Sequence, residues 1–140
     1  SCGLHVHLDM RNDNATKAFN NLVRIEPALF KMVPKSRVEN RYCRPTPTHE
    51  LKDAFDFDDR YFGVNAQAYH KYKTIEVRLH SGTTNFKKIY NWIRLLSKAA
   101  YDTPCINKTI TTPTGLIRAL NLTDEGQKYI KERVKEHSGE

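Results

Sequence analysis

The first residues of the chain alternate apolar and polar side chains with a period of two. Leu4, Val6 and Leu8 would face one side of an extended strand, and the residues between them would face the other. Those polar residues are His5, His7 and Asp9. The pattern therefore predicts a half-buried β-strand that presents two imidazoles and a carboxylate on one face.

Helical spacing follows a turn that contains Asn14. Apolar residues recur three and four positions apart as far as Val33, which predicts an amphipathic helix. Pro27 falls inside this pattern and removes one backbone donor, so we expect a kink or two short helices that meet near Glu26. Residues 34–59 are irregular and rich in proline, which indicates a long loop.

Two more strands are predicted, at residues 60–68 and 74–80. The second strand alternates aliphatic residues with a polar set made of Thr74, Glu76, Arg78 and His80. After a Ser-Gly-Thr-Thr turn, a helix to about Tyr101 is predicted from an apolar stripe. Its members are Phe86, Ile89, Tyr90, Ile93, Leu96 and Ala100.

The last part of the chain carries clear helix-start signals. Pro113 suits the first turn of a short helix that ends near Leu120, and Thr123 can cap a final helix from Asp124 to about His137. Strands and helices together predict an α+β fold, with a mostly antiparallel sheet packed on helices. No composition shift marks a second domain, so residues 1–140 are interpreted as a single domain.

Composition narrows the class of protein. A hydrophobic fraction of 39% excludes a largely disordered chain, and no apolar run approaches the roughly 18 residues that cross a bilayer. The net charge of +7 favours an anionic partner such as a nucleotide or phosphate. Three cysteines without a paired motif fit a reducing compartment, so we expect a cytoplasmic protein without a membrane partner.

If the two alternating strands share a sheet, their polar faces combine into one surface. That surface would hold His5, His7, Asp9, Glu76, Arg78 and His80. Carboxylate and imidazole groups can bind a divalent cation, and a guanidinium can balance phosphate charge. The residues alone leave two simpler interpretations open, namely ordinary surface histidines and a structural ion pair between Glu76 and Arg78.

Five segments in order resemble the putative amidoligase family of the carboxylate-amine ligase superfamily, which includes glutamine synthetase and glutamate-cysteine ligase. They read SCGLHVHLD, SRVENRYC, RYFGVNAQ, KTIEVRLHSGT and KIYNWIRLL, and they span residues 1 to about 96. The resemblance implies a glutamine synthetase-like catalytic domain that uses ATP with Mg²⁺ or Mn²⁺ to join a carboxylate and an amine. The substrates would be small molecules or peptides.

The resemblance also implies roles for individual residues. His5 and Glu76 would be metal ligands, and His7 would contact the ATP phosphates. Arg78 would be the catalytic residue that stabilises the transferring phosphoryl group. Arg60 is expected to contact phosphate or substrate. Arg37 and Arg41, on the loop, are expected to contact substrate.

The chain departs from the family in one respect. The family has an earlier strand with a pair of glutamates that hold metal, and no such strand precedes Ser1 here. We therefore expect a C-terminal portion of the catalytic domain, completed by N-terminal strands or by a companion chain.

Two other functions stay open. A noncatalytic module could keep the fold and its basic cleft for binding. A rolling-circle replication nuclease would use the His-hydrophobic-His strand for metal and a tyrosine such as Tyr69 to attack DNA. The second strand, with Glu76 and Arg78, has no part in that scheme, which disfavours nucleic acid as a partner.

Overall fold

The computed structural model describes residues 3–35, 44–57 and 61–138 of the chain. They form a three-stranded sheet and six α-helices, so the predicted α+β class is confirmed. The strands are β1 (Leu4–Asp9), β2 (Val64–Asn65) and β3 (Thr74–His80). The helices are α1 (Ala15–Leu29), α2 (Leu51–Ala54), α3 (Tyr69–Tyr72), α4 (Phe86–Tyr101), α5 (Pro113–Leu120) and α6 (Asp124–His137), with a 3₁₀ turn η1 (Phe30–Met32) after α1.

The sheet is antiparallel throughout, as expected. β3 is the central strand, with β1 on one edge and β2 on the other. The register places His7 directly opposite Glu76. Ile75 and Val77 of β3 are buried, whereas Glu76 and Arg78 are only partly buried. One face of the sheet therefore joins the core, and the other face carries polar side chains outward.

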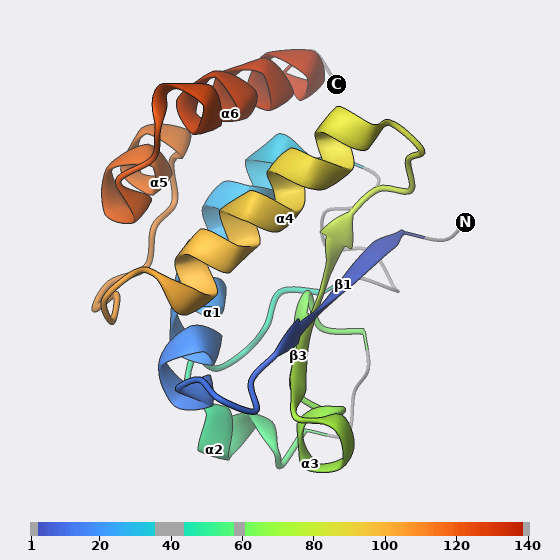
Figure 1. Cartoon of the computed structure of the whole chain (residues 1–140), viewed down its shortest axis with the longest axis vertical. Helices are drawn as coiled ribbons and strands as arrows, with labels where there is room; N and C mark the ends of the chain where they lie inside the picture. The colour runs from blue at the N-terminus through green and yellow to red at the C-terminus, as the bar shows by residue number, and fades with distance from the viewer. Residues whose placement is uncertain (1–2, 36–43, 58–60, 139–140) are drawn as a thin grey trace.

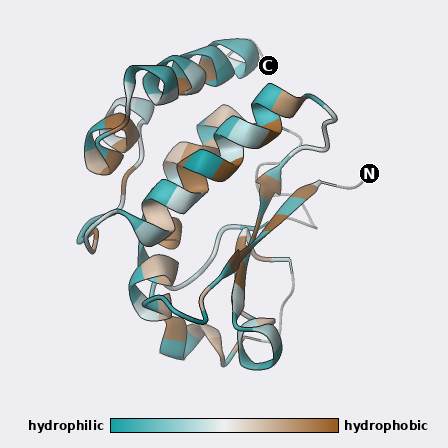
Figure 2. Cartoon of the chain, viewed as in Figure 1, coloured by the Kyte–Doolittle hydropathy of each residue, from teal (hydrophilic) through white to brown (hydrophobic). Residues whose placement is uncertain are grey.

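The helices cover the apolar face of this sheet in layers (Figure 1). α1 packs on β2 and β3, and α4 packs along α1. α6 lies along α4 on the side away from the strands and also contacts η1. Figure 2 shows α6 as largely hydrophilic, with a few hydrophobic positions spaced along it. No helix among the described residues is long and apolar enough to cross a membrane.

Side-chain caps fix the starts of the four long helices. In each, an Asn or Thr side chain accepts a hydrogen bond from the backbone N–H three residues later. The caps are Asn14, Asn85, Thr112 and Thr123. The predicted starts and ends of α5 and α6 are confirmed. α4 begins after Asn85, one residue beyond the predicted Ser-Gly-Thr-Thr turn.

Pro27 does not divide the first helix. α1 continues through it to Leu29, so of the two predicted outcomes, the one with two short helices that meet near Glu26 is wrong. Pro27 has no N–H, so the Val23 carbonyl one turn earlier lacks its intrahelical hydrogen bond, yet the helix persists. Ile25 and Ala28 on either side are fully buried, and this packing holds the turn in place.

The strand predicted over residues 60–68 is much shorter in the structure. β2 consists of Val64 and Asn65 only, and residues 58–60 lie outside the described residues. The Asn65 side chain accepts a hydrogen bond from the Gln67 backbone N–H at 2.9 Å, and the chain turns there into α3. Asparagine stabilises turns in this way, so it ends the strand.

The buried face of α4 also differs from the predicted stripe. Leu96 and Ala100 are buried as expected, but Phe86 is 74% exposed. The core side of α4 is instead led by Trp92, together with Leu95, Leu96, Ala99 and Ala100. Apolar residues lie around much of this helix, so periodicity alone could not identify the buried side.

A buried carboxyl group ties the long loop to the sheet. Glu26 Oε1 accepts a hydrogen bond from the Thr46 backbone N–H at 2.7 Å, and Glu26 Oε2 lies 2.6 Å from Thr46 Oγ1. Thr46 Oγ1 in turn accepts from the Val64 N–H at 3.0 Å. Burial raises the pKa of Glu26 to about 7, although the hydrogen bonds from Thr46 oppose the rise.

Gly63 lies where these elements approach one another most closely. A Cβ atom at this position would stand 2.6 Å from Leu79 Cδ2 and 2.7 Å from Glu26 Oε2. Both neighbours are buried, and Glu26 is also hydrogen bonded, so neither can move away freely. The Gly63 carbonyl accepts from the Arg78 backbone N–H at 2.8 Å, which places this glycine directly beside β3.

Gly63→Ala should lower the free energy of unfolding by about 1–3 kcal/mol, because the added methyl group overpacks the site between Leu79 and Glu26. Urea denaturation of both proteins measures the difference. Unchanged stability in the variant would contradict the close approach described for Gly63.

Glu26 should make the free energy of unfolding depend on pH. Its folded pKa of about 7 lies above the ordinary 4.5, so the folded state holds the proton more tightly. The stabilisation is complete below pH 4.5 and is lost as the pH rises through 7, a change of about 3 kcal/mol.

Glu26→Gln keeps the shape of the group but cannot titrate. The stability of the wild type relative to Glu26→Gln should therefore fall between pH 4.5 and 7. Glu132→Gln, which removes an exposed carboxylate, is the matched control. Parallel pH profiles for the wild type and Glu26→Gln would contradict the raised pKa of Glu26.

Candidate active site

The outward face of β1 and β3 brings together four of the residues identified from the sequence. His5 and His7 come from β1, and Glu76 and Arg78 come from β3. Each pair is two residues apart on its strand, so both members point to the same face. The antiparallel register then sets the pairs against each other. We refer to these four residues as the Glu76 cluster.

Both oxygens of Glu76 are engaged, and they face different partners. Glu76 Oε2 lies 3.0 Å from His7 Nε2 and 3.7 Å from His5 Nδ1. Glu76 Oε1 accepts a hydrogen bond from Arg78 Nη1 at 3.1 Å. One carboxylate is thus shared by a guanidinium on one side and by two imidazoles on the other.

The cluster is partly withdrawn from solvent. The side chains of Glu76 and Arg78 are 15% and 12% exposed, whereas those of His5 and His7 are 34% and 49% exposed. The imidazoles therefore form the solvent side of the cluster. The interaction between Glu76 and Arg78 lies beneath them and is screened less by water than a surface pair would be.

Two further residues orient the cluster. The Arg78 guanidinium lies over the Tyr61 ring, 5.6 Å from its centroid, which is within the range of a cation–π contact. His7 Nδ1 lies 3.4 Å from Thr74 Oγ1, so the imidazole is placed between Thr74 and Glu76. Thr74 shares the alternating polar face of its strand, and that signal could have identified it. Nothing in the sequence singled out Tyr61.

Asp9 does not join the cluster that the sequence placed on this surface. It forms a pair with Arg11 at 2.8 Å, and the hydrogen bonds from Arg11 hold the pKa of Asp9 below its usual value. Asp9 pairs with Thr74 at the end of the strand rather than with Glu76.

His80 was predicted on the outward face, and this prediction was wrong. The register shifts between Leu4 and Val6, so the alternation of β3 is broken before His80. His80 is buried, with its ring 4.9 Å from that of Trp92. Its Nδ1 lies 2.6 Å from the Ser81 carbonyl oxygen. The irregularity in the pairing thus turns this imidazole into the core.

Three predicted contact residues, Arg37, Arg41 and Arg60, lie outside the described residues. The described residues that flank these segments are in contact with one another. The Arg44 N–H donates to the Tyr61 carbonyl, and the Gly63 N–H donates to the Arg44 carbonyl, both at 2.8 Å. The backbone around Arg44 therefore lies beside residues 61–63, next to β3.

The Glu76 cluster supplies only some of the ligands that a metal ion needs. Among the described residues, no group of three or more His, Cys, Asp or Glu side chains is arranged to hold a metal ion. Magnesium prefers oxygen ligands and commonly takes one or two carboxylates, with water and substrate phosphate as the others. Glu76 can supply such a carboxylate, but the described residues do not form a complete magnesium site.

Comparisons with known proteins agree with the resemblance noted in the sequence. The family described as "Putative amidoligase enzyme" matches residues 29–100, just over half of the chain. This segment includes Glu76 and Arg78, whereas β1 with His5 and His7 precedes it. No curated protein and no solved structure matches the chain. On the evidence of the family match, the chain belongs to the putative amidoligase family.

Proposed function

We propose that this protein is an ATP-dependent carboxylate–amine ligase that forms an amide bond through an acyl phosphate. The observation that carries the proposal is the Glu76 cluster, in which one carboxylate contacts both a guanidinium and two imidazoles. Membership of the amidoligase family supports ligase activity. A glutamine synthetase-like domain, completed by further strands or by a companion chain, belongs to the same proposal.

The proposed reaction has two steps. A carboxylate oxygen of the first substrate attacks the γ-phosphorus of ATP, the bond from that phosphorus to the bridging oxygen breaks, and ADP leaves. The amine nitrogen of the second substrate then attacks the acyl carbon. The bond from that carbon to the phosphate oxygen breaks, phosphate leaves, and the nitrogen gives up its proton to form the amide.

Arg78 is the proposed catalytic residue, because charge develops on the phosphoryl oxygens during the transfer. Its guanidinium is oriented before substrate binds, since Glu76 holds it at 3.1 Å and Tyr61 lies against its face. A preorganised cation loses little free energy to reorientation during the reaction. His7, on the solvent side of the cluster, is the proposed contact to the ATP phosphates.

Glu76 and His5 are the proposed protein ligands for Mg²⁺ or Mn²⁺. Oε2 is the Glu76 oxygen proposed to bind the metal, because it faces the two imidazoles whereas Oε1 holds Arg78. A bound metal ion would neutralise phosphate charge. Its other ligands would come from water, from phosphate and from residues beyond the cluster. We place Arg60, Arg37 and Arg41 as contacts to phosphate or substrate.

Arg78→Ala should raise the dissociation constant for Mg-ATP by about tenfold or more, since it removes a charge-assisted contact to phosphate. Isothermal titration calorimetry of the 140-residue chain measures this constant. Arg118→Ala, which removes an exposed arginine of α5, is the matched control and should leave the constant unchanged.

Glu76→Gln should abolish Mg-dependent ADP release, because the amide is a poor metal ligand and no longer pairs with the charge of Arg78. The assay supplies a mixture of amino acids as carboxylates and hydroxylamine as the amine, so that an acyl phosphate is trapped as a hydroxamate. Full activity in both Glu76→Gln and Arg78→Ala would refute these assignments. ATP binding without any turnover in the protein completed by the proposed further strands or companion chain would instead identify a noncatalytic binding module.

A further inference from the structure

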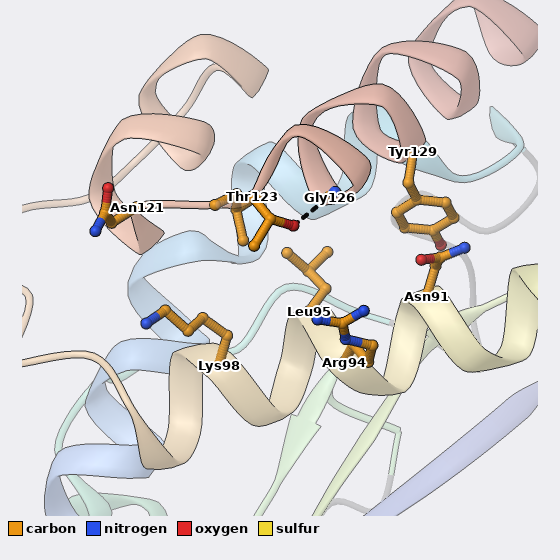
Figure 3. Close-up of a pocket in the computed structure, with 9 residues that line it drawn as sticks. Asn91, Arg94, Leu95, Lys98, Asn121, Thr123, Gly126 and Tyr129 are labelled. Atoms are coloured by element: carbon orange, nitrogen blue, oxygen red, sulfur yellow. Dashed lines mark hydrogen bonds between the residues drawn. The ribbon is translucent and has the colours of Figure 1, made fainter.

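A cavity lies away from the Glu76 cluster, where α4 meets the corner between α5 and α6. Its volume is about 260 Å³. Figure 3 shows side chains from α4 on one side of it and side chains of the corner and α6 on the other. The lining residues are Asn91, Arg94, Leu95 and Lys98 of α4, then Asn121, Leu122, Thr123, Gly126 and Tyr129.

The lining of the cavity is cationic. It contains Arg94 and Lys98 and no Asp or Glu. Glu125, just outside the lining, approaches Arg94 Nη1 at 3.6 Å and offsets part of that charge. A single negative charge therefore matches this cavity better than a doubly charged phosphate does.

Tyr129 supplies a hydroxyl proton without an acceptor. The residue is only 7% exposed, and its hydroxyl proton finds no acceptor in the part of the chain that the structure describes, because the Arg133 guanidinium beside it can only donate. Figure 3 shows the ring pointing from α6 toward Asn91 on α4. A buried hydroxyl without a hydrogen bond raises the free energy of the folded protein, so a ligand that accepts a hydrogen bond from Tyr129 would be stabilised here.

The Tyr129 hydroxyl can only donate to such an acceptor as a neutral phenol. Burial raises the pKa of Tyr129 to about 12, with the nearby Arg133 cation partly opposing the rise. The hydroxyl therefore keeps its proton at neutral pH. The N-terminal end of α6 is a weaker hydrogen-bond donor to a ligand, because the Gly126 N–H already donates to Thr123 Oγ1 at 3.2 Å.

Part of the remaining lining is apolar, beside the polar side chains of Asn91, Asn121 and Thr123. Leu95 and Leu122 contribute aliphatic surface, and Gly126 adds no side chain. Small-molecule sites commonly combine such surface with a few polar groups that fix orientation. A volume of about 260 Å³ suits a ligand the size of a single substituted ring.

We propose that this cavity binds a small organic monocarboxylate. Arg94 and Lys98 attract the carboxylate, the Tyr129 hydroxyl donates a hydrogen bond to the ligand, and Leu95 and Leu122 pack against its apolar body. The site goes beyond the proposed ligase activity, because one wall is formed by α5–α6 residues outside the matched family segment. Its occupancy requires neither ATP nor the Glu76 cluster.

Benzoate is the probe for this site. Titration of the ¹⁵N-labelled 140-residue chain at constant ionic strength should give saturable shifts in the amides of Gly126 and Leu95, with a dissociation constant in the millimolar range typical of a ligand this small. Benzamide, which has the same shape without the charge, should bind at least tenfold more weakly. Inorganic phosphate should not displace benzoate.

Arg94→Gln and Tyr129→Phe should each weaken benzoate binding by about fivefold or more. Tyr129→Phe should change the melting temperature little, because the hydroxyl it removes donates no hydrogen bond within the described residues. Lys87→Gln changes the same charge on an exposed position of α4 and should bind benzoate like the wild type.

The absence of saturable shifts would overturn the proposal. So would unchanged affinity in both Arg94→Gln and Tyr129→Phe, or displacement of benzoate by phosphate. Because no ATP is present, failure here leaves the ligase proposal unaffected, and failure of the ligase assay leaves this site unaffected.

Discussion

The candidate active site depends on the pairing of β1 with β3. Since side chains alternate along both strands, the register that sets His7 opposite Glu76 also decides which residues face outward. A slip of one residue would turn the imidazoles toward the core. β3 is held on both edges, by β1 and by β2, so Glu76 and Arg78 lie on the best-supported strand of the sheet.

The opposite side of the sheet supports the same position. The Gly63 carbonyl accepts from the Arg78 backbone, and Gly63 can approach so closely because it has no side chain. Next to Gly63, the buried carboxyl of Glu26 accepts a hydrogen bond from the Thr46 N–H. Thr46 Oγ1 in turn accepts a hydrogen bond from the Val64 N–H. The helices thus fix the backbone beneath the cluster, while Tyr61 and Glu76 fix the guanidinium above it. This rigidity is what a preorganised cation requires.

Much of this arrangement could be predicted because it rests on local signals. Alternation identified β1 and β3 and the outward positions of His5, His7, Glu76 and Arg78. Pro113 in the first turn identified α5, and the Thr123 cap identified α6. The mostly antiparallel sheet was also predicted, and the pairing of β1 with β3 confirms it. Alternation and helix-start signals could not identify the family. The family was identified from the resemblance of five short segments in order, and the match to residues 29–100 confirms it.

The errors came from interactions between distant residues. A register shift buried His80, and the contact of its ring with Trp92 helped to select the buried side of α4. The pairing of Glu26 with Thr46 spans twenty positions and leaves no periodic signal. The Asn65 side chain ended β2 early through a bond that depends on its conformation. Such contacts are properties of the assembled fold.

The most direct test of whether the Glu76 cluster is the active site is to locate the bound metal–nucleotide. Mn²⁺–ATP, added in small amounts to the ¹⁵N-labelled chain, broadens the amide signals nearest the metal, and Mg²⁺–ATP provides the diamagnetic reference. If the Glu76 cluster binds the metal–nucleotide, the strongest broadening should occur at the amides of His7 and Glu76, and the amides of α6 should be little affected. Broadening centred on other elements, or spread evenly over the basic surface, would contradict it.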